Sequence, residues 1–214
     1  MIPLGVLAST RSAPAGLTLT HRGTWPVESD ASLTAVPIGD ASAARTVLVV
    51  ATWASNLVRS ILDVTIGGVT AALDLDDTTN RAGVAVWRAT VPTGTSADVV
   101  LTWNTGFPST VAVLTAPAAL TVVDAVASPV AVGAVTSTIT SATAAGGVVV
   151  AGAASGEAGI VTLSPSGTSI IAADNQAAST YATTGAPLTI TSTVDVAATN
   201  TARNPFAAVA YKGA

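Results

Sequence analysis

The sequence predicts an all-β protein, an antiparallel β-sandwich or jelly roll. Short runs of Val, Ile, Leu and Thr recur throughout the 214 residues, and Gly, Pro, Asn or Asp separates each run from the next. Strands and turns produce this alternation, because β-branched side chains suit a pleated surface and the separating residues suit turns. No stretch shows a sustained helical period, so we expect a sandwich and not a parallel α/β sheet.

The expected strands follow one another at short intervals. They are 17–20, 46–53, 63–66, 69–73, 84–91, 98–103 and 110–114, then 120–123, 147–153, 160–163, 169–172, 188–196 and 206–211. The run 46–53 is apolar enough to be covered on both faces. Gly67-Gly68 lies between two β-branched runs. It is typical of a two-residue hairpin turn, in which glycine adopts a positive φ without steric cost.

The domain organisation predicted from these elements is an N-terminal arm, 1–16, followed by a β-sandwich, 17–214. The order of elements is similar in the two halves, which favours a pseudo-repeat of 17–118 and 119–214, two related half-sandwiches. The alternative is that any β protein rich in Ala, Val and Thr looks self-similar at this level. The arm begins with an apolar run and is a candidate for docking on a neighbouring molecule.

Composition excludes several classes of partner and chemistry. The formal net charge is −4, and the eight Lys and Arg residues are scattered, so the basic surface that nucleic-acid binding requires is missing. The longest uncharged runs, 99–123 and 125–156, are interrupted by Pro, Gly, Ser and Thr, which argues against a membrane-spanning helix. The absence of Cys excludes disulfides, thiolate metal sites and cysteine nucleophiles.

Catalytic patterns are not evident in the sequence. His21 is the only histidine, and no nucleophile-elbow sequence accompanies it. Glu28 and Glu157 are the only glutamates, and nothing pairs them for acid–base work. Gly67-Gly68 and Gly146-Gly147 precede strands, whereas phosphate-binding loops precede helices. We therefore expect a protein without catalytic residues and without a cofactor.

One segment offers oxygen ligands for a metal. Asp74, Asp76, Asp77 and Asn80 lie close together in the sequence, and Ca²⁺ prefers such ligands. The spacing of an EF-hand is absent. The favoured interpretation is a solvated loop whose charges keep a sheet edge from pairing with neighbours, with a Ca²⁺ site as the alternative.

The few aromatic residues admit two interpretations. Trp53, Trp87 and Trp103 fall within predicted strands and are interpreted as core fillers. Exposed aromatic rings that stack on a glycan are expected on loops. The candidates for that role are Trp25, Phe107 and Tyr181.

Three segments together resemble a known group of proteins. They are 35–50 (AVPIGDASAARTVLVV), 64–69 (VTIGGV) and 86–100 (VWRATVPTGTSADVV). This succession resembles β-sandwich proteins encoded among the virion genes of tailed phages and gene-transfer agents, especially those of alphaproteobacteria. The likeness covers about residues 33–115, with a looser echo in 206–211. These motifs consist of strands and turns, so the resemblance implies a fold and a particle component, and it carries over no site residues.

The resulting expectation is a non-enzymatic virion protein, a capsid decoration, cement or head-spike component. Its partners are other virion proteins such as the major capsid protein, it forms a homo-oligomer with a trimer favoured, and it is located in the virion after assembly in the host cytoplasm. One alternative is a tail or tail-fibre protein that binds a host receptor or glycan. Another is a bacterial surface adhesin module.

Overall fold

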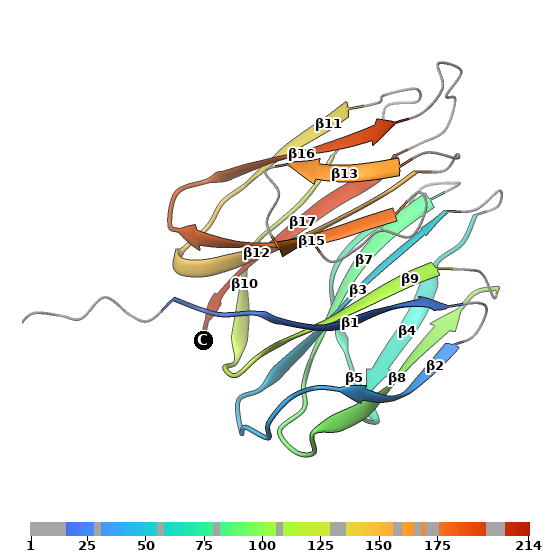
Figure 1. Cartoon of the computed structure of the whole chain (residues 1–214), viewed down its shortest axis with the longest axis vertical. Coiled ribbons are helices and arrows are strands. Elements are labelled where there is room, and N and C mark those ends of the chain that lie inside the picture. The colour runs from blue at the N-terminus through green and yellow to red at the C-terminus, as the bar shows by residue number, and fades with distance from the viewer. Residues whose placement is uncertain are drawn as a thin grey trace, which may run out of the picture.

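A computed structural model of the chain is shown in Figure 1. It describes residues 16–27, 31–54, 58–78, 82–105, 109–128, 136–155, 160–164, 168–169, 176–195 and 204–214. Every regular element in these ranges is a β-strand, and all the pairings between strands are antiparallel. The predicted all-β sandwich class is therefore confirmed. Within the same ranges there is no helix with the length and hydropathy needed to cross a membrane.

The strands divide into two sets along the chain. The first set is β1 (Thr20–Val27), β2 (Ala31–Pro37), β3 (Thr46–Ala54), β4 (Ile61–Ile66), β5 (Val69–Thr70), β6 (Ala72–Thr78), β7 (Ala82–Thr90), β8 (Ser96–Trp103) and β9 (Ser109–Ala116). The second set is β10 (Leu120–Ala127), β11 (Thr136–Ser141), β12 (Ala145–Ala154), β13 (Ile160–Ser164), β14 (Thr168–Ser169), β15 (Gln176–Thr184), β16 (Leu188–Asp195) and β17 (Phe206–Gly213).

These strands form four sheets, two from each set. Sheet A has the order β1-β9-β3-β7-β6, and sheet B has the order β2-β8-β4-β5. Sheet C has the order β10-β17-β12-β15-β14, and sheet D has the order β11-β16-β13. In each set the chain crosses repeatedly between its two sheets, as in the Greek keys of a jelly roll. The first set is thus one sandwich, of sheets A and B, and the second is another, of sheets C and D.

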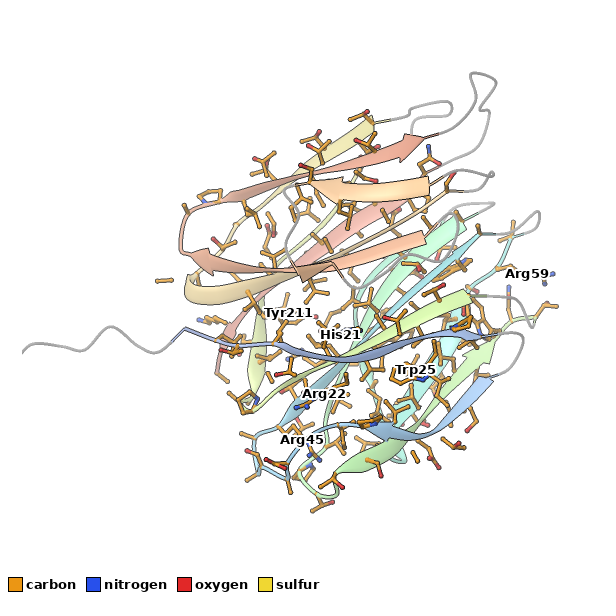
Figure 2. The ribbon with its side chains drawn as sticks, viewed as in Figure 1. His21, Arg22, Trp25, Arg45, Arg59 and Tyr211 are labelled. Atoms are coloured by element: carbon orange, nitrogen blue, oxygen red, sulfur yellow. The ribbon has the colours of Figure 1, made fainter. Side chains whose placement is uncertain are left out.

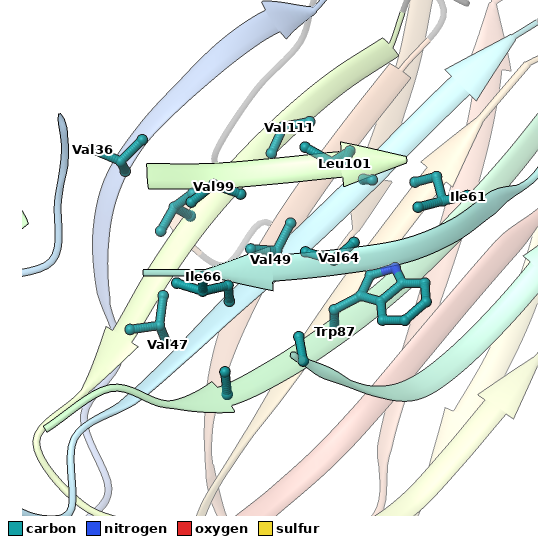
Figure 3. Packing of buried hydrophobic residues seen from close by; sticks show 14 of the residues in the cluster. Val36, Val47, Val49, Ile61, Val64, Ile66, Trp87, Val99, Leu101 and Val111 are labelled. Atoms are coloured by element: carbon teal, nitrogen blue, oxygen red, sulfur yellow. The ribbon is translucent and has the colours of Figure 1, made fainter. Parts of the chain in front are cut away.

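The four sheets stack in the order B, A, C, D (Figure 1). One core cluster joins sheets A and B, a second joins A and C, and a third joins C and D. Figure 3 shows the first of these clusters, with Val49 and Val111 of sheet A packed against Val64 and Leu101 of sheet B. Sheets A and C therefore have neighbours on both faces. This explains why the central strands β3 and β9 are buried along almost their whole length.

The two sandwiches have the same strand order. If β1, β9, β3, β7 and β6 of sheet A are matched with β10, β17, β12, β15 and β14 of sheet C, every neighbour relation is preserved. The same holds for β2-β8-β4 of sheet B and β11-β16-β13 of sheet D. The short strand β5 is the element of sheet B without a counterpart among the described strands of sheet D.

The match extends to single residues. In β1, the pairing with β9 slips between His21 and Gly23, so Arg22 is the bulged residue. In β10, the pairing with β17 slips between Val122 and Asp124, so Val123 is the bulged residue. Matching the registers of β3 with β9 and of β12 with β17 brings these two bulges to the same position. Arg22 and Val123 are therefore structurally equivalent.

The Gly67-Gly68 hairpin is confirmed. Ile66 of β4 pairs with Val69 of β5, and the two glycines between them have φ values of 59° and 77°. Positive φ at both central residues is the geometry of a type I′ turn, which matches the twist of the flanking strands.

Three sequence-based assignments were wrong or incomplete. Residues 74–78 belong to strand β6, which pairs with β7 at the edge of sheet A, and not to a solvated loop. Trp25 lies within strand β1, which begins at Thr20, where the predicted strand 17–20 ends. Strands β2 and β11 were not predicted, and β11 is made almost entirely of Ser and Thr, whose weak apolar alternation conceals the strand. The predicted arm lies outside the described residues except for Gly16.

Candidate functional site: the junction between the two sandwiches

The contact between sheets A and C, here called the junction, is the feature that unites the two sandwiches. Its apolar centre is a cluster of buried residues that includes Leu48, Val50, Val84 and Leu114 of sheet A and Val150, Val209 and Tyr211 of sheet C. The sheets approach closely at Gly152 of β12. A Cβ atom there would lie 2.7 Å from Cγ1 of Val84 and 3.3 Å from Cγ1 of Val50. Glycine at this position therefore sets the spacing of the junction.

A buried hydrogen-bond network connects sheets A and C on one side of the junction. The side chain of Asp74 is 4% exposed, and its Oδ2 atom accepts bonds from Nε of Arg88 at 2.9 Å and from the hydroxyl of Tyr211 at 2.8 Å. Arg88 also donates through Nη1 to the backbone oxygen of Leu120. Asp74 and Arg88 belong to sheet A, whereas Tyr211 and Leu120 belong to sheet C. This network joins the two sheets with charge-assisted hydrogen bonds.

Burial and the adjacent carboxylate keep Tyr211 neutral. Desolvation raises the pKa of Tyr211 well above its ordinary value, and the negative charge of Asp74 raises it further. The phenol is therefore protonated at neutral pH and donates its hydrogen bond to Asp74.

A second polar contact joins β6 to β17. Oδ2 of Asp77 accepts a hydrogen bond of 2.9 Å from the backbone N–H of Phe206, the first residue of β17. Burial raises the pKa of Asp77 to about 6, against the lowering effect of that hydrogen bond, and the nearby charge of Asp76 raises it further. The contact fixes the start of β17. Burial makes the ionised form of this carboxylate less stable in the protein than it is in water.

The three candidate metal ligands do not converge. Asp74 is held by Arg88 and Tyr211, Asp77 binds the backbone of Phe206, and Asp76 accepts a hydrogen bond from Thr78. Across the described part of the chain, no group of three or more His, Asp or Glu side chains is placed to hold a metal ion. Sequence proximity suggested a shared ligand role, but the strand and its bulge between Leu73 and Leu75 direct these carboxylates to separate partners.

His21 has a local contact within its own strand. Its Nε2 atom lies 3.0 Å from Oγ1 of Thr24, and the imidazole is exposed on the edge strand β1 (Figure 2). The hydroxyl beside it belongs to a strand residue, not to a nucleophile on a sharp turn. Among the described residues, the hydrogen-bond partner of His21 is Thr24 and not a carboxylate that would orient the imidazole as the base of a catalytic triad.

The tryptophans interpreted as core fillers are buried, as predicted. Trp53, Trp87 and Trp103 lie in the cluster between sheets A and B, and the rings of Trp53 and Trp103 meet edge to face at 5.3 Å. Trp25 is half-buried and packs against the same cluster, so its ring is not an open platform on a loop. Phe107 and the side chain of Tyr181 lie outside the described residues.

Arg45 has a structural role that was not predicted from the sequence. Its guanidinium is buried and donates to five backbone carbonyls, those of Gly39, Asp40, Val91, Thr93 and Gly94, at 2.6–2.9 Å. These carbonyls come from two loops that connect sheets A and B, one between β2 and β3 and the other between β7 and β8, so one side chain joins two loops. The only signal in the sequence was an arginine immediately before the apolar run 46–53.

A pocket of about 350 Å³ lies at the end of the junction where β1 begins. It is lined by Leu17, Ala118, Ala144, Ala145, Gly146, Lys212, Gly213 and Ala214. The backbone N–H of Leu17 donates to the oxygen of Gly146 at 2.7 Å, which fixes the entry of the chain into β1. The lining consists mostly of small apolar side chains and glycine backbone, with Lys212 as its ionisable side chain.

Comparisons with known proteins identify no relative. No protein-family model, no curated protein and no solved structure matches this chain.

Proposed function

We propose that this chain is a non-enzymatic structural protein of a virion, a capsid decoration, cement or head-spike component on the particle surface. The observation that carries the proposal is the junction, which joins two sandwiches into one body of four stacked sheets. Close-packed interiors have low compressibility and transmit strain, so such a body resists deformation. A protein that reinforces a particle surface needs this property.

The buried charged groups support a structural role. Arg45 joins two loops, Asp74 connects Arg88 to Tyr211, and Asp77 fixes the start of β17. Each of these groups is engaged with backbone or with a side chain of a neighbouring strand. Their hydrogen bonds stabilise a single arrangement of the sheets, because a buried polar group that loses its partner is costly.

The outer face of sheet D is suited to contact with neighbours in an assembly. On β11 and on residues 189–193 of β16 the outward residues are threonines, in the cross-strand pairs Thr136–Thr193, Thr138–Thr191 and Thr140–Thr189. The hydroxyls of the second and third pairs lie 3.3 Å and 3.0 Å apart. Covering these threonine pairs requires no desolvation of charge. Other virion proteins, such as the major capsid protein, are the proposed partners.

The architecture gives support at the level of fold analogy. Jelly rolls serve as capsid and lectin domains, and a fold by itself hosts many functions. We propose that the chain acts as a homo-oligomer, with a trimer favoured, in which the N-terminal arm, 1–16, contacts a neighbouring molecule. A monomer in sedimentation at micromolar concentration contradicts the oligomer, and full particle binding after deletion of 1–16 contradicts the role of the arm.

Electron microscopy of labelled particles tests the proposed function. Particles purified from the parent system are incubated with an antibody against this chain and imaged. A symmetric array of label over the head is the expected result. Label confined to the tail or its tip contradicts decoration of the head and favours a tail or tail-fibre protein that binds a receptor. Particles that carry no label contradict the virion role.

A further inference from the structure

Arg22 occupies a position at which the fold does not require arginine. It is the bulged residue of β1, and the equivalent bulge of β10 carries Val123, which is 38% exposed. Since the same backbone feature forms around a valine, the bulge itself does not explain the arginine. Bulges frequently redirect a side chain, and this one directs Arg22 towards the loop that leaves β2.

The guanidinium of Arg22 is fixed in place by two contacts. Its Nε atom donates to Oγ1 of Thr115 on β9 at 2.7 Å. Its terminal atoms lie against Gly39, where a Cβ atom would be 2.1 Å from Nη2 and 2.6 Å from Cζ. Gly39 has a φ of 74°, so glycine both adopts this conformation and leaves room for the guanidinium. The side chain is therefore pre-organised and partly buried.

A second guanidinium lies on the same loop. Nη1 of Arg45 donates to the backbone oxygens of Gly39 at 2.7 Å and Asp40 at 2.8 Å, so both arginines contact Gly39 (Figure 2). Burial lowers the pKa of Arg45, and the positive charge of Arg22 lowers it further, whereas the charge of Asp40 raises it. Two cations thus share one short loop in a protein whose net charge is −4.

The two arginines differ in how much of their hydrogen-bonding capacity the protein uses. Arg45 is bound to five carbonyls, as described above. For Arg22, the acceptor among the described residues is Thr115, through Nε, and none of the carboxylates described lies within ion-pair distance of its guanidinium. Both terminal nitrogens of a fixed fork therefore remain available. A planar guanidinium with two parallel N–H groups matches the two oxygens of a carboxylate or a phosphate.

We propose that the Nη1 and Nη2 groups of Arg22, held over Gly39, bind an oxyanion group, either a carboxylate or a phosphate. The positive charge of Arg45 behind the loop adds to the attraction, and Thr115 holds the fork in its binding orientation. The site lies on the edge strand of sheet A, where an anionic group of a small molecule or a partner has access. At the equivalent bulge of the second sandwich stands Val123, whose side chain has no group that binds an anion.

The experiment follows the arginine side-chain NMR signals of the full chain. The protein, labelled with ¹⁵N and ¹³C at arginine, is titrated with sodium acetate or sodium phosphate at pH 7, with sodium chloride used to hold the ionic strength constant. We expect saturable shifts of the Arg22 signals with half-saturation at about 1–10 mM. Shifts with acetate alone identify a carboxylate ligand, and shifts with phosphate alone identify a phosphate ligand.

Variants separate this site from general attraction to cations. In Arg22→Gln, the rise in melting temperature produced by the effective anion is expected to disappear, and Arg22→Lys is expected to bind at least about tenfold more weakly because the fork is lost. Lys212→Gln, an exposed cation on β17, is the matched control and should bind as the original protein does. Equal shifts with chloride, or an unchanged anion effect in Arg22→Gln, overturn the proposal.

Discussion

The two sandwiches share a strand order but place their large side chains on opposite strands. In the first sandwich, Trp53 of β3 lies opposite Ser109 of β9. The equivalent pair in the second sandwich is Ala153 of β12 and Phe206 of β17. All four residues are buried. Each pair combines one large and one small residue, so the core volume is filled in both cases while the residue types are exchanged.

A second difference concerns polar groups at the junction. Leu114 of β9 and Tyr211 of β17 occupy equivalent positions, yet Leu114 is purely apolar, whereas Tyr211 donates to Asp74. Of these two equivalent positions, the one on β17 therefore makes a polar connection across the junction, whereas the one on β9 contributes apolar packing. The same strand order is therefore compatible with apolar packing at one position and with a hydrogen bond at the equivalent position.

The largest expected effect comes from the first core. Trp53→Ala removes a buried indole and its edge-to-face contact with Trp103, and we expect a loss of about 3–5 kcal/mol in the free energy of unfolding. Urea unfolding followed by circular dichroism measures this change. Val123→Ala, at a partly exposed position, is the control and should change stability by less than about 0.5 kcal/mol. A loss below about 1 kcal/mol for Trp53→Ala contradicts a tightly packed first core.

The next effect tests the spacing of the junction. Gly152→Ala places a methyl group 2.7 Å from Cγ1 of Val84, which forces sheets A and C apart, and we expect a cost of about 1–3 kcal/mol. Gly213→Ala is a matched control, because no atom lies within 4 Å of a Cβ built there. Thermal unfolding of the two variants gives the comparison. Equal melting temperatures would mean that the sheets are less closely packed at Gly152 than the distances indicate.

A smaller effect is expected at the polar side of the junction. Tyr211→Phe keeps the ring but removes the hydroxyl that donates to Asp74, while Arg88 continues to bind the carboxylate. We expect a loss of about 1–2 kcal/mol. The matched variant Leu114→Ala, at the equivalent position, acts through packing alone and should cost more, about 2–5 kcal/mol. Chemical denaturation that ranks the two variants in the reverse order contradicts this assignment.

The smallest effect depends on pH. The pKa of Asp77 is about 6 in the folded protein, against an ordinary value of about 3.8 for aspartate, so the folded state binds more protons than the unfolded state between these values. Stability from this group therefore falls as pH rises from about 4 to 6 and stays lower above that range. Solvent screening at this partly exposed carboxylate reduces the loss to about 1 kcal/mol.

Asp77→Asn isolates that contribution. Asparagine retains an oxygen that accepts from the backbone N–H of Phe206, but it does not titrate. The difference in stability between the original protein and the variant, measured by urea unfolding at pH 4 and pH 7, is expected to change by about 1 kcal/mol in favour of the variant. A constant difference across this range contradicts the raised pKa.

Local patterns predicted some elements accurately and others not at all. Strand β3 and the Gly67-Gly68 turn were recognisable, because an apolar β-branched run and a pair of glycines have few other uses. Strand β11 was missed because its outward threonines and inward serines differ little in polarity. Strand β6 was mistaken for a loop because the acidic residues in it are accommodated by partners distant in sequence, such as Phe206 and Tyr211.

The sequence by itself determined the all-β class, the positions of most strands and the burial of Trp53, Trp87 and Trp103, since these follow from side-chain shape and polarity over a few neighbouring residues. Tertiary structure alone decided the stacking of sheets A and C, the five carbonyl partners of Arg45 and the contact of Asp74 with Tyr211. The residues of that last contact are 137 positions apart in the chain. Local propensity carries no information about such pairs, because their meeting depends on which sheet faces pack together.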